Sequence, residues 1–191
     1  MSDAFAYLSV LLSIILGLAI AEVLQGYRTL LLARGKVRLY APPLIWSGIM
    51  LVLAVHFWWA SFGLAGREDW DFTAFCAVLM QTLMMFMGAA LLLPHKIEDD
   101  IDLRAHYYRE AGPFFIFGLL FTVFGFIKDW LLDRHIIGGG LPMFFFLFFI
   151  GLTMLALLVR KPRLHEIIAP VMAAAVIIFI GMMFARLGRF Q

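Results

Sequence analysis

Six apolar stretches of the sequence are each long enough to cross a lipid bilayer as a helix: about residues 4–26, 42–64, 72–93, 113–132, 141–159 and 167–186. A crossing takes about 20 apolar residues, because each residue adds about 1.5 Å of helix against roughly 30 Å of hydrocarbon. Charged residues make up only 15% of the 191 positions, whereas a soluble domain carries roughly a quarter. The sequence therefore predicts an all-α integral membrane protein, in which residues 1–191 form a single membrane domain with six transmembrane helices in one bundle.

The two halves of the sequence share one feature that an internal repeat would explain. Three helices in each half would give the halves opposite orientations, as in inverted-repeat transporters. Between residues 1–93 and 113–186, the one shared feature is a charge late in the leading helix, Glu22 in the first half and Lys128 with Asp129 in the second. Two inverted three-helix halves are therefore a hypothesis that rests on this single match.

The distribution of lysine and arginine predicts the orientation, because these residues favour the cytoplasmic side. With the N-terminus outside, ten of them are cytoplasmic and five are outside; the ten are Arg28, Arg34, Lys36, Arg38, Lys96, Arg104, Arg109, Arg160, Lys161 and Arg163. Four of the five tryptophans (Trp58, Trp59, Trp70 and Trp130) then lie near the outer boundary, as in an aromatic belt. We expect both termini outside.

The segment Ala19-Ile20-Ala21 resembles a signal-peptidase site, so Glu22 has two interpretations. The N-terminal residues MSDAF carry Asp3 and no basic residue, whereas a signal peptide begins with a positive region. Cleavage would also leave the basic residues 28–38 on the exported side. We therefore expect Glu22 to stay inside the first membrane helix.

Small residues in membrane helices usually mark the face that packs on another helix. In the first stretch Ser13, Gly17, Ala21 and Gln25 recur at every fourth position, and Glu22 lies beside them. Similar faces hold His56 in the second stretch (Gly48, Val52, His56, Ala60, Gly63), Gln81 in the third (Ala74, Ala77, Gln81, Gly88) and Asp129 in the fourth (Gly118, Thr122, Gly125, Asp129). We expect these polar side chains to face other helices, with Lys128 reaching outward to the boundary.

Ionisable residues within a membrane are costly and often functional. Glu22, Gln25, His56, Gln81 and Asp129 together predict a polar pathway through the bilayer. The alternative is structural, because isolated interhelical hydrogen bonds and wetted helix ends also place such residues in membranes. We expect His56 and Asp129 to approach each other. Glu22 should find a partner near the basic end, with Arg28, Gln25 and His165 as candidates.

The connection after the third stretch is the richest polar segment, HKIEDDIDLRAHYYRE. Read as a helix, it places His95, Glu98, Asp99, Asp102 and His106 on one face, and carboxylates with imidazoles can bind a divalent cation. The more common alternative is an interfacial helix that turns Ile97, Ile101 and Tyr108 toward lipid. We expect this interfacial helix, with the metal site as the minority interpretation.

Several function classes find no support in the residues. A net charge of +2 gives no basis for nucleic-acid binding, and the single Cys76 excludes an internal disulfide and a cysteine-based metal cage. Haem needs a second deep histidine beside His56, and the other four histidines fall in loops or at helix ends. No nucleophile–base pair lies in the apolar stretches, so an enzyme is disfavoured and no cofactor is expected.

The segments SIILGLAIAEVLQGYRTLL, HFWWASF and DLRAHYY resemble small polytopic inner-membrane proteins of bacteria that have no characterised function. The resemblance implies the bacterial inner membrane as the location and carries no activity or site residue. The residues themselves favour a channel or secondary transporter for a proton, a cation or a small solute. The alternative is a non-transporting oligomeric scaffold or partner-binding subunit. In that case basic residues would contact lipid headgroups or a protein: Arg34, Lys36, Arg38, Arg160, Lys161 and Arg163. A homo-oligomer is expected in either case.

Overall fold

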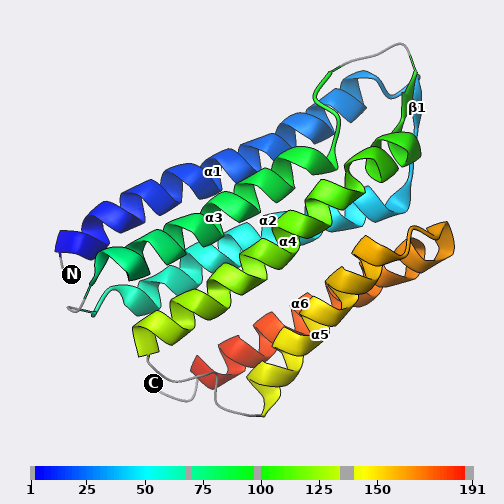
Figure 1. The fold of residues 1–191 in the computed structure, drawn as a ribbon. Helices are drawn as coiled ribbons and strands as arrows, with labels where there is room; N and C mark the ends of the chain where they lie inside the picture. The colour runs from blue at the N-terminus through cyan, green and yellow to red at the C-terminus, as the bar shows by residue number, and fades with distance from the viewer. Residues whose placement is uncertain (1–2, 68–69, 97–99, 134–139, 188–191) are drawn as a thin grey trace.

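The structure is a computed structural model that describes residues 3–67, 70–96, 100–133 and 140–187. Helices account for most of this part of the chain (Figure 1). In order, the elements are α1 (Asp3–Leu32), β1 (Val37–Arg38), α2 (Ala41–Ser61), the 3-10 turn η1 (Phe62–Leu64), α3 (Phe72–Leu92), β2 (Ile101–Asp102), α4 (Leu103–Asp133), α5 (Leu141–Leu158) and α6 (Pro162–Leu187). The prediction of an all-helical chain is confirmed.

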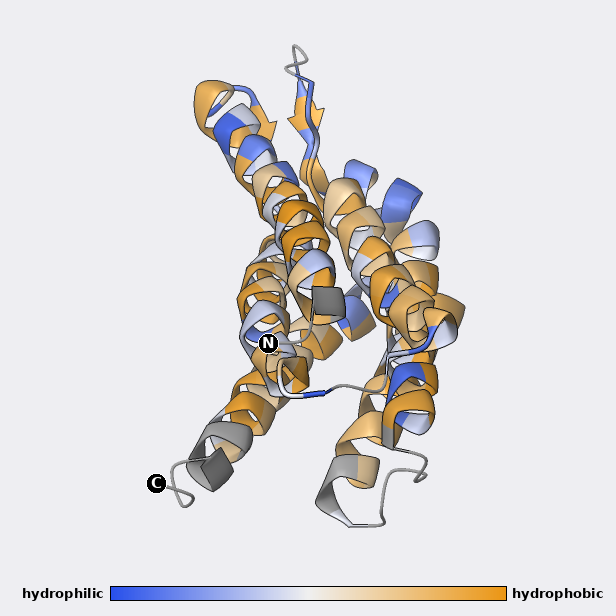
Figure 2. Cartoon of the chain, turned by 90° about the vertical axis from the view of Figure 1, so that its left-hand side faces the viewer, coloured by the Kyte–Doolittle hydropathy of each residue, from blue (hydrophilic) through white to orange (hydrophobic). Residues whose placement is uncertain are grey.

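Five of these helices (α1, α2, α3, α4 and α6) are long and apolar enough to cross a membrane. The sixth, α5, has 18 residues and is apolar over the shorter segment Met143–Leu158. At 1.5 Å per residue α5 is about 27 Å long, slightly less than a typical hydrocarbon thickness. Figure 2 shows hydrophobic residues along the length of the helices. The fold therefore fits a membrane-embedded protein, and a sixth crossing by α5 stays a prediction.

The helices pack as a group of four with a helical hairpin attached. α3 contacts α1, α2 and α4, while the hairpin of α5 and α6 joins the group through α2–α6 and α4–α5 contacts (Figure 1). This division into four and two does not follow the two three-helix halves of the inverted-repeat hypothesis. α3 and α4, which that hypothesis assigns to different halves, share the most extensive contact in the described chain.

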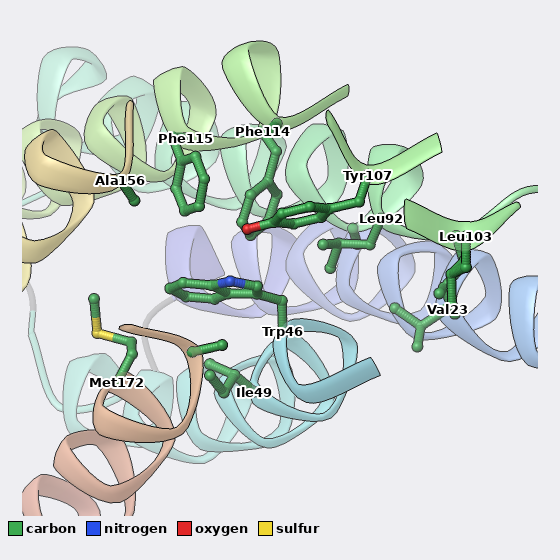
Figure 3. Packing of buried hydrophobic residues seen from close by; sticks show 14 of the residues in the cluster. Val23, Trp46, Ile49, Leu92, Leu103, Tyr107, Phe114, Phe115, Ala156 and Met172 are labelled. Carbon is green, nitrogen blue, oxygen red and sulfur yellow. The ribbon is translucent and has the colours of Figure 1, made fainter. Parts of the chain in front are cut away.

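The main core draws buried residues from all six helices and lies toward the end that carries β1 and β2. Trp46 of α2 is buried there, with its ring centroid 5.4 Å from both Phe114 and Phe115 of α4 in edge-to-face contacts. Met172 of α6 and Ile49 of α2 complete the packing around the indole (Figure 3). Aromatic pairs of this geometry add to the stabilisation from dispersion contacts. The core fixes the α5–α6 hairpin to the four-helix group at this end.

Two aspartates determine where helices begin. The carboxylate of Asp71 accepts a hydrogen bond from the Ala74 backbone amide (2.6 Å) at the start of α3. The carboxylate of Asp102 accepts from the backbone amides of Arg104 (2.9 Å) and Ala105 (3.0 Å) at the start of α4. Such caps satisfy backbone donors that have no partner inside the helix.

The expected interfacial helix is wrong, because α4 begins ten residues before the apolar stretch at 113. Its first turns bury Leu103, Tyr107 and Ala111 in the main core. Ile101, expected to face lipid, is 4% exposed and lies in β2, which pairs in parallel with β1. The capping carboxylate of Asp102 and the internal packing outweigh the polar composition of this segment. Ile97 lies outside the described residues.

Two prolines lie inside helices rather than at their ends. The predicted apolar stretch 113–132 begins at Pro113, but α4 continues through this residue, and α6 continues through Pro170. Proline within membrane helices is tolerated because neighbouring groups satisfy the freed carbonyl. α6 begins at Pro162, five residues before the predicted stretch 167–186. α1 ends at Leu32, six residues after the end of the predicted stretch 4–26.

Candidate functional site

Glu22 and His95 are in hydrogen-bond contact between α1 and the segment that follows α3. His95 Nε2 lies 2.8 Å from Glu22 Oε2 and 3.3 Å from the Glu22 backbone oxygen. Both side chains are about one-third exposed or less, at 33% for His95 and 27% for Glu22. A hydrogen-bonding partner for Glu22 near the basic end was predicted, and the structure confirms one.

The segment that carries His95 packs closely against the backbone of α1. α3 ends at Leu92, and an extended Leu93 followed by Pro94 turns the chain back toward α1. The approach is so close that a Cβ atom at Gly26 would lie 2.3 Å from Leu93 Cβ. Thr29 Oγ1 donates to the carbonyl of Gln25 (3.1 Å) and reaches the carbonyl of His95 (3.4 Å). Glu22, Gly26 and Thr29, at spacings of four and three, thus hold one side of the turn.

The partner itself differs from the three that the sequence suggested. Arg28 and Gln25 are exposed on α1. His165 is 1% exposed and bonds elsewhere: its Nε2 donates to the Val159 carbonyl (3.0 Å), and its Nδ1 accepts from the Tyr107 hydroxyl (2.8 Å). His95 was missed because it was assigned to a surface helix. No periodic pattern in the sequence identifies it, because His95 reaches α1 only through the turn at Leu93-Pro94.

The small-residue face of α1 is largely exposed within one chain. Ser13, Gly17 and Gln25 are exposed, Ala21 is half-buried, and the Ser13 hydroxyl accepts a hydrogen bond from Trp58 Nε1 of α2 (3.1 Å). No atom lies within 4 Å of where a Cβ at Gly17 would be. The inner face of α1 consists instead of Ala19 and larger residues that are buried: Phe5, Leu8, Leu12, Leu16 and Val23. The expectation was that the small-residue face packs on another helix, and most of it finds no such partner within one chain. A small-residue pattern indicates close helix packing but does not specify whether the partner helix belongs to the same chain.

On α3 the corresponding expectation is confirmed, because Ala74, Ala77, Gln81 and Gly88 are all buried. α3 is contacted by three helices, so its small face lies inside the chain. Gln81 is 6% exposed, and its Nε2 would lie 2.6 Å from a Cβ at Gly125 of α4. Its Oε1 is buried without a hydrogen-bond partner in the described structure. Gln81 therefore packs at the contact between α3 and α4.

The predicted approach of His56 and Asp129 is wrong. Asp129 Oδ1 instead pairs with Lys128 Nζ at 3.0 Å, and no described residue makes a hydrogen bond with His56. The His56 ring lies edge-to-face with Phe179 of α6 (centroids 6.3 Å apart). Lys128 is the more buried member of its pair, at 20% exposed against 45% for Asp129, with its ammonium 5.9 Å from the Phe57 ring centroid. Lys128 was expected to reach outward, but Asp129 is the more exposed of the two residues. Lys128 stays inside because the alkyl stem of lysine packs well on an aromatic ring.

The candidate metal residues do not share a helix face. His95 lies in the connection after α3, Asp102 in β2 and His106 in α4, while Glu98 and Asp99 lie outside the described residues. Within the described ranges, no three His, Cys, Asp or Glu side chains are grouped as metal ligands. The face on which the metal hypothesis depended is thus broken by the strand and the helix cap.

The same end of the molecule carries the basic residues proposed to contact headgroups: Arg34, Lys36, Arg38, Arg160, Lys161 and Arg163, all exposed. Arg38 pairs loosely with Asp100 (3.4 Å). Beneath them, the Tyr40 and Tyr108 hydroxyls lie 3.2 Å apart, and the Arg104 guanidinium lies 5.7 Å from the Tyr40 ring centroid. Burial raises the pKa of Tyr40 above its usual range, so the Tyr40 hydroxyl is uncharged at neutral pH.

No family model, curated protein or solved structure matches the chain. The resemblance to small bacterial inner-membrane proteins therefore stays an expectation from the sequence.

Proposed function

We propose that the protein is a non-transporting polytopic membrane subunit that self-associates through the outer face of α1. The observation that carries this proposal is the exposure of Gly17 and Gln25, on the side of α1 opposite its packed face. Exposed aliphatic side chains of Val10, Ile14 and Leu18 run beside them. A row of small residues next to a ridge of larger ones lets two helix backbones approach closely in a membrane.

The distribution of polar side chains favours this role over transport. Glu22 bonds His95, Asp129 bonds Lys128, and Gln81 packs on Gly125. Glu22 and Asp129 are thus engaged locally, whereas His56 Nδ1 and Gln81 Oε1 are buried without hydrogen-bond partners in the described structure. The core around Trp46 is apolar and aromatic. A pathway for an ion needs successive polar groups that line a shared wetted space. The alternative role, association within the membrane, needs no such space.

The association is tested by replacing Gly17 with leucine. A leucine side chain at position 17 meets open space within one chain, so Gly17→Leu should preserve folding. The larger side chain should obstruct the contact between subunits and shift the protein toward monomer. Gly151→Leu on α5 is the matched control, because Gly151 is also exposed with open space around its Cβ position. Single-molecule photobleaching in liposomes measures the subunit number. A wild-type protein that is monomeric at all densities would refute the proposal.

Transport stays a second candidate because of one observation, the ionisable Glu22–His95 pair on a helix apolar enough to span. Proteoliposomes with a panel of ions measure flux, and Glu22→Gln removes the carboxylate charge while keeping its shape. Flux above that of empty liposomes that falls in Glu22→Gln would establish transport and overturn the first proposal. Background flux from both proteins would exclude transport of the ions tested.

A further inference from the structure

An exposed strip along α4 begins with a basic residue and continues with aliphatic ones. Arg109, Ile116 and Val123 are exposed and recur at spacings of seven residues, which places them on one face of the helix. We call this face the α4 strip. The apolar stretch of α4 begins at Pro113. If α4 spans the hydrocarbon, Arg109 therefore lies at the polar edge of the membrane and Ile116 just inside its apolar part.

Arg160 brings a second guanidinium group to this strip. α4 and α5 pack against each other, and a Cβ atom at Gly118 of α4 would lie 3.6 Å from Cγ2 of Thr153 in α5. Arg160 follows the last residue of α5 by two positions and continues this seam toward the basic end. Its Nη2 lies 3.3 Å from the place where a Cβ at Gly112 would be, so the guanidinium lies against the α4 backbone.

The lack of a side chain at Gly112 lets the Arg160 guanidinium reach the α4 strip. Gly112 follows Arg109 by three residues and precedes Ile116 by four, the spacings at which residues are neighbours on a helix surface. The two guanidinium groups are thus placed on adjacent turns of α4, directly before its apolar stretch begins. The phosphate groups of a bilayer lie at this boundary, outside the hydrocarbon.

The charges around the two arginines leave a positive excess. Arg109 Nε donates to the Glu110 carboxylate (3.0 Å), and Arg109 Nη2 lies 3.2 Å from His106 Nδ1. Arg160 takes part in none of the ion pairs found among the described side chains at this end. Two guanidinium groups and one carboxylate therefore give one net positive charge, which matches the single negative charge of a phosphodiester.

We infer that the α4 strip binds an anionic phospholipid whose phosphate lies between Arg109 and Arg160. An acyl chain of this lipid follows Ile116 and Val123. The planar fork of a guanidinium matches the oxygens of a phosphate. The aliphatic part of the strip favours a lipid over a free phosphate ion, which would use only the basic end. An ammonium group in the headgroup would meet the unpaired Arg160, so a headgroup without one is favoured.

The experiment titrates the full-length protein in detergent with dioleoyl phosphatidylglycerol, and native mass spectrometry measures the affinity of the lipid. Arg160→Gln removes the unpaired guanidinium, so affinity should fall about ten-fold, the contribution of one charge-assisted hydrogen bond. Glu110→Gln releases Arg109 from its ion pair, so affinity should rise, a gain that misfolding does not produce. Dioleoyl phosphatidylcholine should bind wild type more weakly than phosphatidylglycerol does.

Arg163→Gln is the matched control, because Arg163 is an exposed arginine at the start of α6, three residues from Arg160. It removes the same charge at the same end of the molecule, and its effect should stay below about two-fold. Arg160→Lys keeps the charge but loses the planar fork, so its affinity should fall between those of wild type and Arg160→Gln.

Three results would overturn the inference. Equal losses in Arg160→Gln and Arg163→Gln would indicate diffuse attraction to the basic end. Displacement of the lipid by inorganic phosphate at equal concentration would indicate an anion site in which the aliphatic residues play no part. Fewer subunits in Arg160→Gln than in wild type, in liposomes of phosphatidylcholine alone, would identify the occupant as a second copy. The proposed association through α1 is tested separately by Gly17→Leu, because the α4 strip contains no residue of α1.

Discussion

Gly26 is the residue on which the Glu22–His95 pair depends, because it lets Leu93 approach the α1 backbone. We predict that Gly26→Ala destabilises the protein by about 1–3 kcal/mol, the usual cost of forcing an extra methyl into a packed contact. The new Cβ would lie 2.3 Å from Leu93 Cβ, an atom fixed to the backbone that cannot rotate away. The free energy of unfolding in mixed micelles measures the effect.

Gly88→Ala provides the control for this prediction. Gly88 is also buried in a helix, but its added Cβ would meet Met50 at 3.6 Å and Phe114 at 3.8 Å, which are ordinary contacts. Its effect should stay within about 0.5 kcal/mol, and higher helix propensity favours a small gain. Equal destabilisation by both substitutions would mean that the α1 approach is looser than the structure shows.

Glu22 itself is predicted to contribute through its bond to His95. Glu22→Leu removes the acceptor and leaves the imidazole without its partner, so we expect a loss of about 1 kcal/mol in unfolding free energy. Glu22→Gln keeps an acceptor oxygen and should lose less than half of that. The matched control is Glu166→Leu, which removes an exposed carboxylate of α6. Indistinguishable losses in Glu22→Leu and Glu166→Leu would show that the pair is not stabilising.

The residues show which parts of the site the sequence could reveal. Glu22 was identifiable because a carboxylate in an apolar helix requires a polar neighbour. Its partner was not, because His95 reaches α1 only through the turn at Leu93-Pro94, a tertiary feature with no periodic pattern. The choice between Lys128 and Asp129 as the inward residue was likewise decided by the Phe57 ring of another helix.

Among the elements, α4 departs furthest from the sequence prediction, and its start can be tested through the Asp102 cap. Asp102→Ala should cost about 1 kcal/mol in unfolding free energy, because two backbone amides lose their acceptor. Asp102→Asn keeps a capping oxygen and should cost only a few tenths. Asp100→Ala, which removes an exposed carboxylate two residues earlier, serves as the control. A negligible effect of Asp102→Ala would favour a helix that begins near residue 113.

Hydropathy located all six helices but misplaced several of their ends. The apolar stretches report where a helix would contact hydrocarbon, whereas its ends depend on caps and on packing outside the apolar part. Leu103, Tyr107 and Ala111 recur at spacings of four and are all buried, so a helical period was present within the charged segment. Its carboxylates and histidines obscured that period. Pro113 was then read as a boundary, although it is exposed and the helix passes through it.

For the molecule as a whole, the sequence predicted the number of helices but not their grouping into four and two. Small-residue faces identify helices that pack closely, and they do not rank possible partners. The face of α3 is used inside the chain, whereas that of α1 is left on the outside. The small-residue face of α3 packs inside the chain because α3 lies between α1, α2 and α4. This position is a property of the assembled bundle.

The last prediction concerns how many times the chain crosses the membrane, which turns on α5. In a Cys76→Ser background, single cysteines at Lys36, Gly66, Gly140 and Lys161 can be labelled with a membrane-impermeant thiol reagent from either side. Six crossings place Lys36 and Lys161 together and Gly66 with Gly140 on the opposite side. The excess of basic residues predicts that Lys36 and Lys161 are cytoplasmic. If the shorter α5 does not cross, Gly140 and Lys161 will be labelled from the same side. A helix of about 27 Å can still cross if the bilayer thins or flanking residues reach the interface, so we expect the six-crossing pattern.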